Sequence, residues 1–153
     1  MPQSLANVVL HLVWSTKHRE PLIADEIRER LHGYILGVLE NLDCPSIETN
    51  SEPDPIHILC HLSRTITIAK LIEQAKTSTS VWLKTLGAPT AKFFWQGGYS
   101  AFSVSESQIE VVRRYIRNQQ EHHRGAKRMS FQDELRALLK KHRLPFDERY
   151  VWD

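Results

Sequence analysis

The order of strand-forming and helix-forming segments constrains the fold of this chain more than any other feature. Strand-like patterns occur at residues 7–14, 44–49, 56–62 and 93–104. Helical spacing of apolar residues, or a good helix start, occurs at residues 25–41, 67–85, 105–123 and 130–141. This order predicts an α+β fold of the ferredoxin-like type: an antiparallel sheet with helices on one face, followed by C-terminal helices.

The two most regular strands also predict how the sheet is oriented. Residues 7–14 and 56–62 should lie side by side at its centre. Ile56, Ile58 and Cys60 point one way, whereas His57 and Leu59 point the other. The histidine face of the sheet, or a cleft beside it, is then available for a ligand.

Composition narrows the class of protein without naming a function. A chain of 153 residues with 41% hydrophobic residues suits one domain spanning residues 1–153. We expect a soluble, cytoplasmic protein, because no apolar run approaches membrane-spanning length. Cys44 and Cys60 form no paired motif, which argues against a zinc ribbon or a disulfide framework and favours buried thiols. The net charge of +2 does not announce nucleic-acid binding, although basic residues cluster locally, including a linker at 124–128.

The helix predicted at residues 105–123 carries an unusual set of polar groups. Tyr115, Gln119 and His122 share one stripe, beside an apolar stripe that suits a core. A phenol oxygen can attack a phosphodiester, and an amide oxygen can help to hold the metal that polarises the phosphate. From the residues alone, the simpler interpretation of Tyr115 is a side chain at the edge of the core. For His122 and His123 it is a DNA contact or a solvated helix end. Ser105 and Gln108 predict a capping box at the start of this helix.

Several segments together resemble the single-tyrosine HUH transposases, meaning the small bacterial insertion-sequence 200/605-like enzymes and the REP-associated tyrosine transposases. The matching segments are Asp54-Pro-Ile-His-Ile-Leu59, Leu62–Leu71, Lys76–Lys84, Trp95–Val104, Tyr115-Ile-Arg-Asn-Gln119, Glu121-His-His123, Ser130–Glu134 and Tyr150–Asp153. The similarity spans nearly the whole chain, and the order and spacing of the segments make it more specific than any single motif.

The resemblance implies a metal-dependent DNA transposase that works as a homodimer on single-stranded hairpin DNA. By position, Tyr115 is the nucleophile that forms a 5′-phosphotyrosine, and His57 and Gln119 hold a divalent metal, Mg or Mn. No nucleotide cofactor is implied. For DNA contacts we predict Lys17, Arg19, Lys76 and His122, which lie in basic or polar segments.

One position departs from the family pattern. The family reads Asp-His-x-His-Leu-Leu, whereas this chain has Pro55 in place of the first histidine. Strand alternation puts residues 55 and 57 on the same face, so a ligand is missing beside His57. Because magnesium keeps waters and uses phosphate oxygens, the loss predicts weakened metal binding, not certain inactivity.

Three functions therefore remain open at the level of the sequence. The first is a working transposase that cleaves and rejoins single-stranded DNA. The second is a catalytically weakened or inactive DNA-binding protein of the same fold, from a decayed or domesticated element. The third is a ferredoxin-like RNA-binding module, which should carry aromatic residues on its central strands, where this chain has His57 and Leu59.

Overall fold

The structure is a computed structural model that describes residues 2–125 and 128–153. Its sheet contains β1 (Val9–Ser15), β2 (Ser46–Ser51), β3 (Pro55–His61) and β4 (Ser100–Val104). Its helices are α1 (Asp25–Asn41), α2 (Ile68–Lys84), α3 (Ile109–Arg117), α4 (Gln119–Arg124) and α5 (Phe131–Lys141). Of the predicted basic linker 124–128, residues 126 and 127 lie outside the described residues.

The four strands form one antiparallel sheet in the order β2-β3-β1-β4. This order confirms the α+β, ferredoxin-like prediction and the central pairing of β1 with β3. Val13 pairs with His57, and His11 pairs with Leu59, so these side chains share one face. In the described part of the chain, no helix is both long and apolar enough to span a membrane.

One face of the sheet packs on α1 and α2 and holds the larger core. The strands contribute Leu12, Trp14 and Ile58, all of which are fully buried or nearly so. Thr67 caps α2 by accepting a hydrogen bond from the backbone nitrogen of Lys70, as its position just before the helix favours. Cys44 and Cys60 are buried free thiols, which confirms the prediction for the cysteines.

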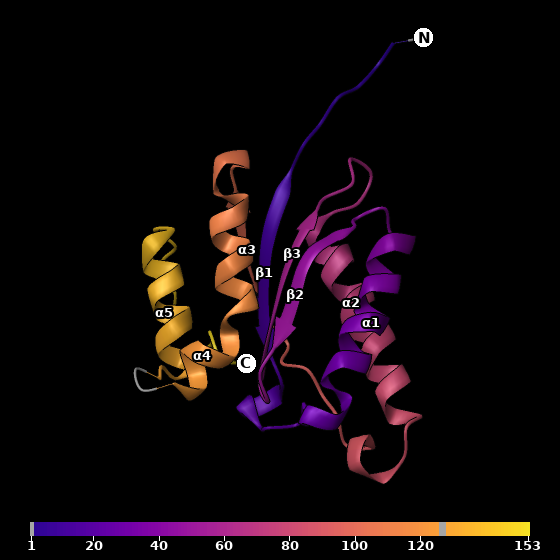
Figure 1. Ribbon diagram of the computed structural model, residues 1–153, viewed down its shortest axis with the longest axis vertical. Helices are drawn as coiled ribbons and strands as arrows, with labels where there is room; N and C mark the ends of the chain where they lie inside the picture. The colour runs from indigo at the N-terminus through magenta and orange to yellow at the C-terminus, as the bar shows by residue number, and fades with distance from the viewer. Residues whose placement is uncertain (1, 126–127) are drawn as a thin grey trace.

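The C-terminal helices cover the opposite face, which the sequence left open for a ligand. In Figure 1, α3 and α5 lie on one side of the sheet, whereas α1 and α2 lie on the other. Ile116 of α3 packs on Leu59 and Val9. From α5, apolar side chains pack on Val13 and Phe102, and Val151 and Trp152 of the C-terminal segment pack there too. The histidine face is therefore enclosed between sheet and helices.

The helix predicted at residues 105–123 is divided, and its predicted capping box is absent. A 3-10 turn (Glu106–Gln108) precedes α3, and Ser105 makes no capping hydrogen bond. Asn118, with φ −94° and ψ 21°, separates α3 from α4. The side-chain nitrogen of Asn50 donates to the carbonyl oxygens of Ile116 and Arg117 at 2.8 and 3.1 Å. This contact occupies acceptors at the end of α3, where a continuous helix would use them for its own amides.

The last strand is also shorter than predicted. Only Ser100–Val104 joins the sheet, while Trp95 makes an isolated bridge with Thr16. Residues 96–98 are instead held from outside the sheet, because the ammonium group of Lys76 donates to the carbonyl oxygens of Gln96 and Gly98 at 2.8 and 2.7 Å.

Candidate active site

Two central strands place a pair of histidines on the enclosed face of the sheet. The Nε2 atom of His11 lies 2.9 Å from the Nδ1 atom of His57, and both side chains are buried. Burial, reinforced by the neighbouring His57, holds the pKa of His11 well below its usual range. His11 was missed in the sequence, although its alternation with Leu10 and Leu12 places it on the face that carries His57.

A single carboxylate from α5 gathers the polar groups above this pair. Ser130 caps α5 by accepting a hydrogen bond from the backbone nitrogen of Asp133, so Glu134 follows within the first turn. One Glu134 oxygen, Oε1, lies 3.0 Å from Nε2 of His57 and 3.2 Å from Nε2 of His123. The other, Oε2, accepts hydrogen bonds from Tyr115 and Gln119.

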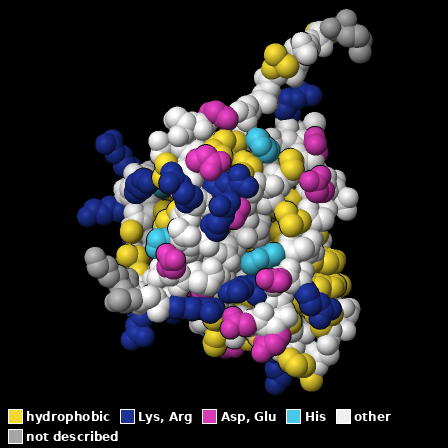
Figure 2. All heavy atoms as spheres, in the orientation of Figure 1, with side chains coloured by type: hydrophobic (Ala, Val, Ile, Leu, Met, Phe, Trp, Pro, Cys, Tyr) yellow, Lys and Arg dark blue, Asp and Glu magenta, His cyan; other side chains and the backbone are white. Residues whose placement is uncertain are grey.

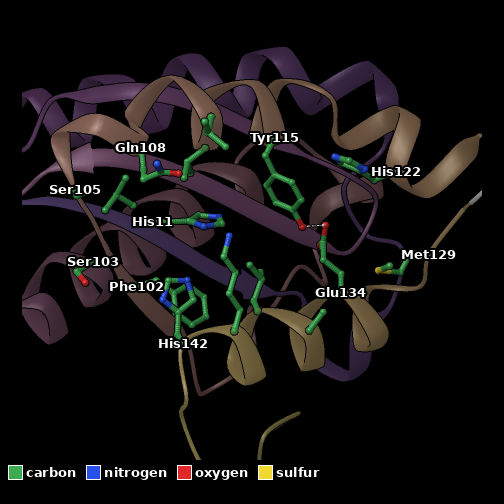
Figure 3. A pocket seen from close by; sticks show the side chains of 16 residues that line it. His11, Phe102, Ser103, Ser105, Gln108, Tyr115, His122, Met129, Glu134 and His142 are labelled. Carbon is green, nitrogen blue, oxygen red and sulfur yellow. Dashed lines mark hydrogen bonds between the residues drawn. The ribbon is translucent and has the colours of Figure 1, made fainter.

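The bond between Tyr115 and Glu134 is short and enclosed. The Tyr115 hydroxyl donates to Oε2 of Glu134 at 2.5 Å, and the amide nitrogen of Gln119 donates to the same oxygen at 3.0 Å. Figure 3 shows the Tyr115 ring and the Glu134 side chain pointing toward each other from facing helices. Tyr115, Gln119 and His57, predicted separately as nucleophile and ligands, therefore meet on one carboxylate.

The protonation of this cluster follows from its contacts. Burial opposes ionisation of Glu134, but His57, His123 and Tyr115 outweigh it and hold the pKa of the carboxyl far below its usual range. Burial and the charge of Glu134 both raise the pKa of Tyr115 well above its usual value. Burial lowers the pKa of His123, but the contact with Glu134 overcomes this and raises it. In this state the carboxylate is charged and the phenol is neutral.

One atom of the cluster is left without a partner. The Oε1 atom of Gln119 is buried and accepts no hydrogen bond from the described residues, although its amide nitrogen is bonded. Within residues 2–125 and 128–153, no three His, Cys, Asp or Glu side chains are already arranged to hold an ion. Pro55 is buried at the start of β3, opposite Ser15, where the missing family histidine would lie.

A pocket of about 770 Å³ opens beside the tyrosine, between α3 and α5. Phe102 and His142 stack on each other in its wall, with ring centroids 4.4 Å apart. The ring centroids of Tyr115 and His122 lie 4.8 Å apart along another part of the wall. Most of the accessible area of the pocket wall is apolar, so the pocket gives a flat, hydrophobic group access to the phenol.

The predicted DNA-binding residues do not form one patch. His122 lines the pocket, whereas Lys17 and Arg19 lie beyond the end of β1. The Lys17 side chain is exposed, and the Arg19 guanidinium lies over the Trp152 ring, 5.4 Å from its centroid. Lys76 is half-buried on the loop carbonyls described above.

The surface charge explains why the composition was uninformative. Figure 2 shows Lys and Arg side chains gathered on one face but mixed with Asp and Glu. Arg113 and Arg117 both pair with Glu48, and Arg124 pairs with Glu52. Several basic residues that looked available in the sequence are therefore already partnered.

The sequence itself decides the family. Residues 4–119 match the family model described as "Transposase IS200 like". The chain belongs to the IS200-like transposase family. Among curated proteins, none matches this sequence.

Two solved structures share the fold of this IS200-like transposase. A candidate transposase from Deinococcus radiodurans R1 has a TM-score of 0.61 at 20% identity, covering 78% of this chain and 98% of its own. A REP-associated tyrosine transposase bound to a REP hairpin has a TM-score of 0.60 at 13% identity. That match covers 83% of this chain and 75% of the other.

The extent of the family match separates two groups of site residues in this transposase. His57, Tyr115 and Gln119 lie inside residues 4–119, with Gln119 at its last position. His123 and Glu134 lie beyond it. Both belong to segments that resemble the family, yet neither was predicted as a site residue, and His123 was interpreted as a DNA contact or a solvated helix end.

Proposed function

We propose that this transposase cleaves and rejoins single-stranded DNA, with Tyr115 as the nucleophile. The observation that carries the proposal is the meeting of Tyr115, His57 and Gln119, from three different elements, at one enclosed carboxylate beside a pocket. A tyrosine at a mere core margin would need none of these polar neighbours. The family membership supplies the reaction type, and the geometry supports the residues.

The reaction balances without an energy-rich cofactor. The Tyr115 oxygen attacks the scissile phosphorus, the bond to the 3′ oxygen breaks, and a 5′-phosphotyrosine forms. The phenol gives up one proton and the departing 3′ oxygen takes one up. Rejoining reverses the step, as the 3′-hydroxyl of a new end attacks the phosphotyrosine. The number of phosphoester bonds is unchanged throughout.

The enclosed state sets a condition on this attack. The Tyr115 hydroxyl points at Glu134 and its pKa is raised, so the phenol remains protonated there. Incoming DNA must replace that contact before the oxygen can reach phosphorus. The neighbouring pocket offers a place for a base next to the scissile phosphate, with Phe102 and His142 as a stacking surface.

The donor set fits the divalent metal that the family uses. His57 and Gln119 would hold Mg or Mn, since both side chains are buried at the cluster and Oε1 of Gln119 has no partner among the described residues. When bound, the metal supplies Lewis-acid polarisation of the phosphate oxygens. Pro55 supports the second candidate, a weakened or inactive DNA-binding protein, because it cannot provide the missing donor.

For the substrate we propose the hairpin ends of a mobile element. One structural relative was solved with a REP hairpin. Lys17 is exposed and suited to phosphate contact, and His122 lies on the pocket wall beside the nucleophile. Arg19 would reach DNA only by leaving Trp152, and Lys76 only by releasing the loop carbonyls.

We also propose a homodimer, in which one protomer's helices can complete the partner's site. Two strands come into question for joining the sheets across a two-fold axis, β1 and β4. The first of these, β1, lies between β3 and β4, so it is excluded, whereas β4 is at an edge. Light scattering at micromolar concentration should give twice the mass of one chain, and a monomer mass would contradict the dimer.

The test of the proposed function is a covalent adduct. Labelled single strands taken from the flanks of the gene, containing imperfect palindromes, are incubated with protein and manganese and resolved on a denaturing gel. Wild type should form adducts, and Tyr115→Phe should form none while still binding the hairpin. Adducts that persist without the phenol oxygen would remove Tyr115 from its role, and binding without adducts in wild type would favour the inactive candidate.

A further inference from the structure

We propose that Glu134 and His123 complete a divalent-metal site around His57. They would supply donors from outside residues 4–119, the part of the chain that matches the family model. These donors would compensate for the histidine that Pro55 replaces on the sheet. The proposal rests on the proposed function only in that the metal would serve Tyr115. It assigns ligands from α4 and α5 to a site that the family pattern places on β3 and the tyrosine helix.

The first step is the convergence of donor atoms. Nε2 of His57 and Nε2 of His123 approach the same Glu134 oxygen at 3.0 and 3.2 Å. Adjacent donors around a six-coordinate ion with bonds of ~2.1 Å lie roughly 3 Å apart. Among the described residues, no three such side chains are placed to hold an ion, and both histidines contact the carboxylate directly. The donor atoms already lie close together, but they contact one another.

The second step is the unpartnered oxygen of Gln119. This side chain is 0% exposed, and its amide nitrogen is fixed on Oε2 of Glu134. Its own Oε1 has no hydrogen-bond partner among the described residues. Buried polar atoms are nearly always satisfied, so an exception needs an explanation. A cation beside Glu134 would satisfy this oxygen, whereas a purely structural ion-pair cluster would not.

The third step is the support behind His57. Its Nδ1 atom contacts His11, so the ring has a partner at each nitrogen and its orientation is fixed. Histidines that bind metals usually hold their second ring nitrogen in such a contact.

The donor types indicate the class of metal. Two imidazoles, a carboxylate and an amide oxygen suit manganese and later divalent transition metals better than magnesium, which prefers oxygen throughout. A carboxylate also brings charge that the missing histidine would not have brought. Glu134 is 2% exposed, so without the ion its charge depends on hydrogen bonds from four neighbours.

The test measures manganese binding by the full chain without DNA, from the loss of the free-ion electron paramagnetic resonance signal at fixed pH. Glu134→Gln should weaken binding at least about tenfold. Asp133→Asn is the matched control, because it removes the same charge from the same turn of α5, and among the described residues its exposed side chain bonds only Arg136. Wild-type affinity in Glu134→Gln, or no binding by wild type at millimolar manganese, would overturn the proposal.

Two further variants keep the outcome decisive. If Glu134→Gln fails to fold by circular dichroism, His123→Gln tests the same site from α4, and unchanged binding there counts against the proposal. Pro55→His placed in the Glu134→Gln chain should restore at least part of the lost affinity, since it returns a donor to the face of His57. Failure to restore any affinity would show that the two positions do not serve one ion.

Manganese binding and adduct formation together distinguish a failure of the metal site from a failure of the proposed function. Tyr115→Phe removes the attacking oxygen and should form no adduct, so adducts report the chemistry, whereas manganese binding by Glu134→Gln reports the ligand. Adducts from wild type together with unchanged manganese binding in Glu134→Gln would reject the ligand assignment and leave the function standing. Manganese binding that depends on Glu134, without any adduct from wild type, would uphold the metal site and reject the chemistry.

Discussion

The hydroxyl oxygen of Tyr115 lies 2.5 Å from a carboxylate oxygen of Glu134, a residue beyond the family-matched segment. The group expected to attack DNA is therefore bonded to a residue outside the matched residues 4–119. The pKa of Tyr115 is raised, so the contact favours the unreactive, protonated phenol. Any change at Glu134 should alter both the pKa of Tyr115 and the contacts that attach α5 to the sheet and to α3.

Restoring the missing histidine should strengthen activity. Pro55→His adds a donor to the face that carries His57, so adduct formation should rise and saturate at lower manganese, with manganese more effective than magnesium. Pro55→Ala is the control, because it removes the proline without adding a donor. Equal adduct yields from the two variants at every metal concentration would mean that position 55 is not the lost ligand.

Hairpin DNA should bind better than duplex, and salt should weaken it. Each phosphate contact on a single strand contributes about −0.7 to the slope of log affinity against log salt. Lys17→Ala should make that slope shallower by about 0.7 if Lys17 contacts a phosphate. Lys140→Ala, on the exposed side of α5, serves as the comparison in the same filter-binding series. Equal affinity for hairpin and duplex would reject the substrate preference.

Replacing Lys76 separates its structural role from its predicted DNA contact. Lys76→Met leaves the carbonyl oxygens of Gln96 and Gly98 without their donor, at a cost of about 1–3 kcal/mol in the free energy of unfolding. Lys84→Met, an exposed position on the same helix, should cost little. Urea denaturation measures the loss, and hairpin affinity of the folded variant tests the DNA contact. Unchanged stability in Lys76→Met would contradict the structural role.

Asp54 should make stability depend on pH. Burial raises the pKa of Asp54 to about 6, whereas its ordinary value is 3.8. The penalty for burying the charge is thus absent below about pH 4 and complete above about pH 6, so stability falls as pH rises between them. Asp54→Asn should remove this slope and gain at most about 3 kcal/mol at pH 7. The test compares urea midpoints of the two proteins across this range. Parallel curves would contradict the shift.

Local sequence patterns were sufficient to predict most of the fold and part of the candidate site. Alternation in residues 7–14 and 56–62 predicted the central strands, and it placed His57 on the face opposite Ile56 and Ile58. The family resemblance brought Tyr115, His57 and Gln119 together correctly in space, although their roles stay predictions. These residues lie in segments whose periodicity or spacing is visible within a few turns.

Contacts between distant segments could not be predicted in the same way. Glu134 meets His57 across 77 residues and Tyr115 across 19, and nothing in a run of charged helix residues signals either contact. The break at Asn118 is accompanied by hydrogen bonds from Asn50, which lies on the distant strand β2. His123 was misjudged because adjacent histidines on a helix point apart, and only the position of α5 shows which of them faces inward.

The break at Asn118 gives the site a joint. It leaves Tyr115 on one short helix and Gln119 with His123 on another, and the two helices are connected by a single non-helical residue. The direction of the phenol is therefore set by α3, and the directions of the amide and imidazole groups are set by α4. In one straight helix, a single helix axis would set the directions of all three side chains.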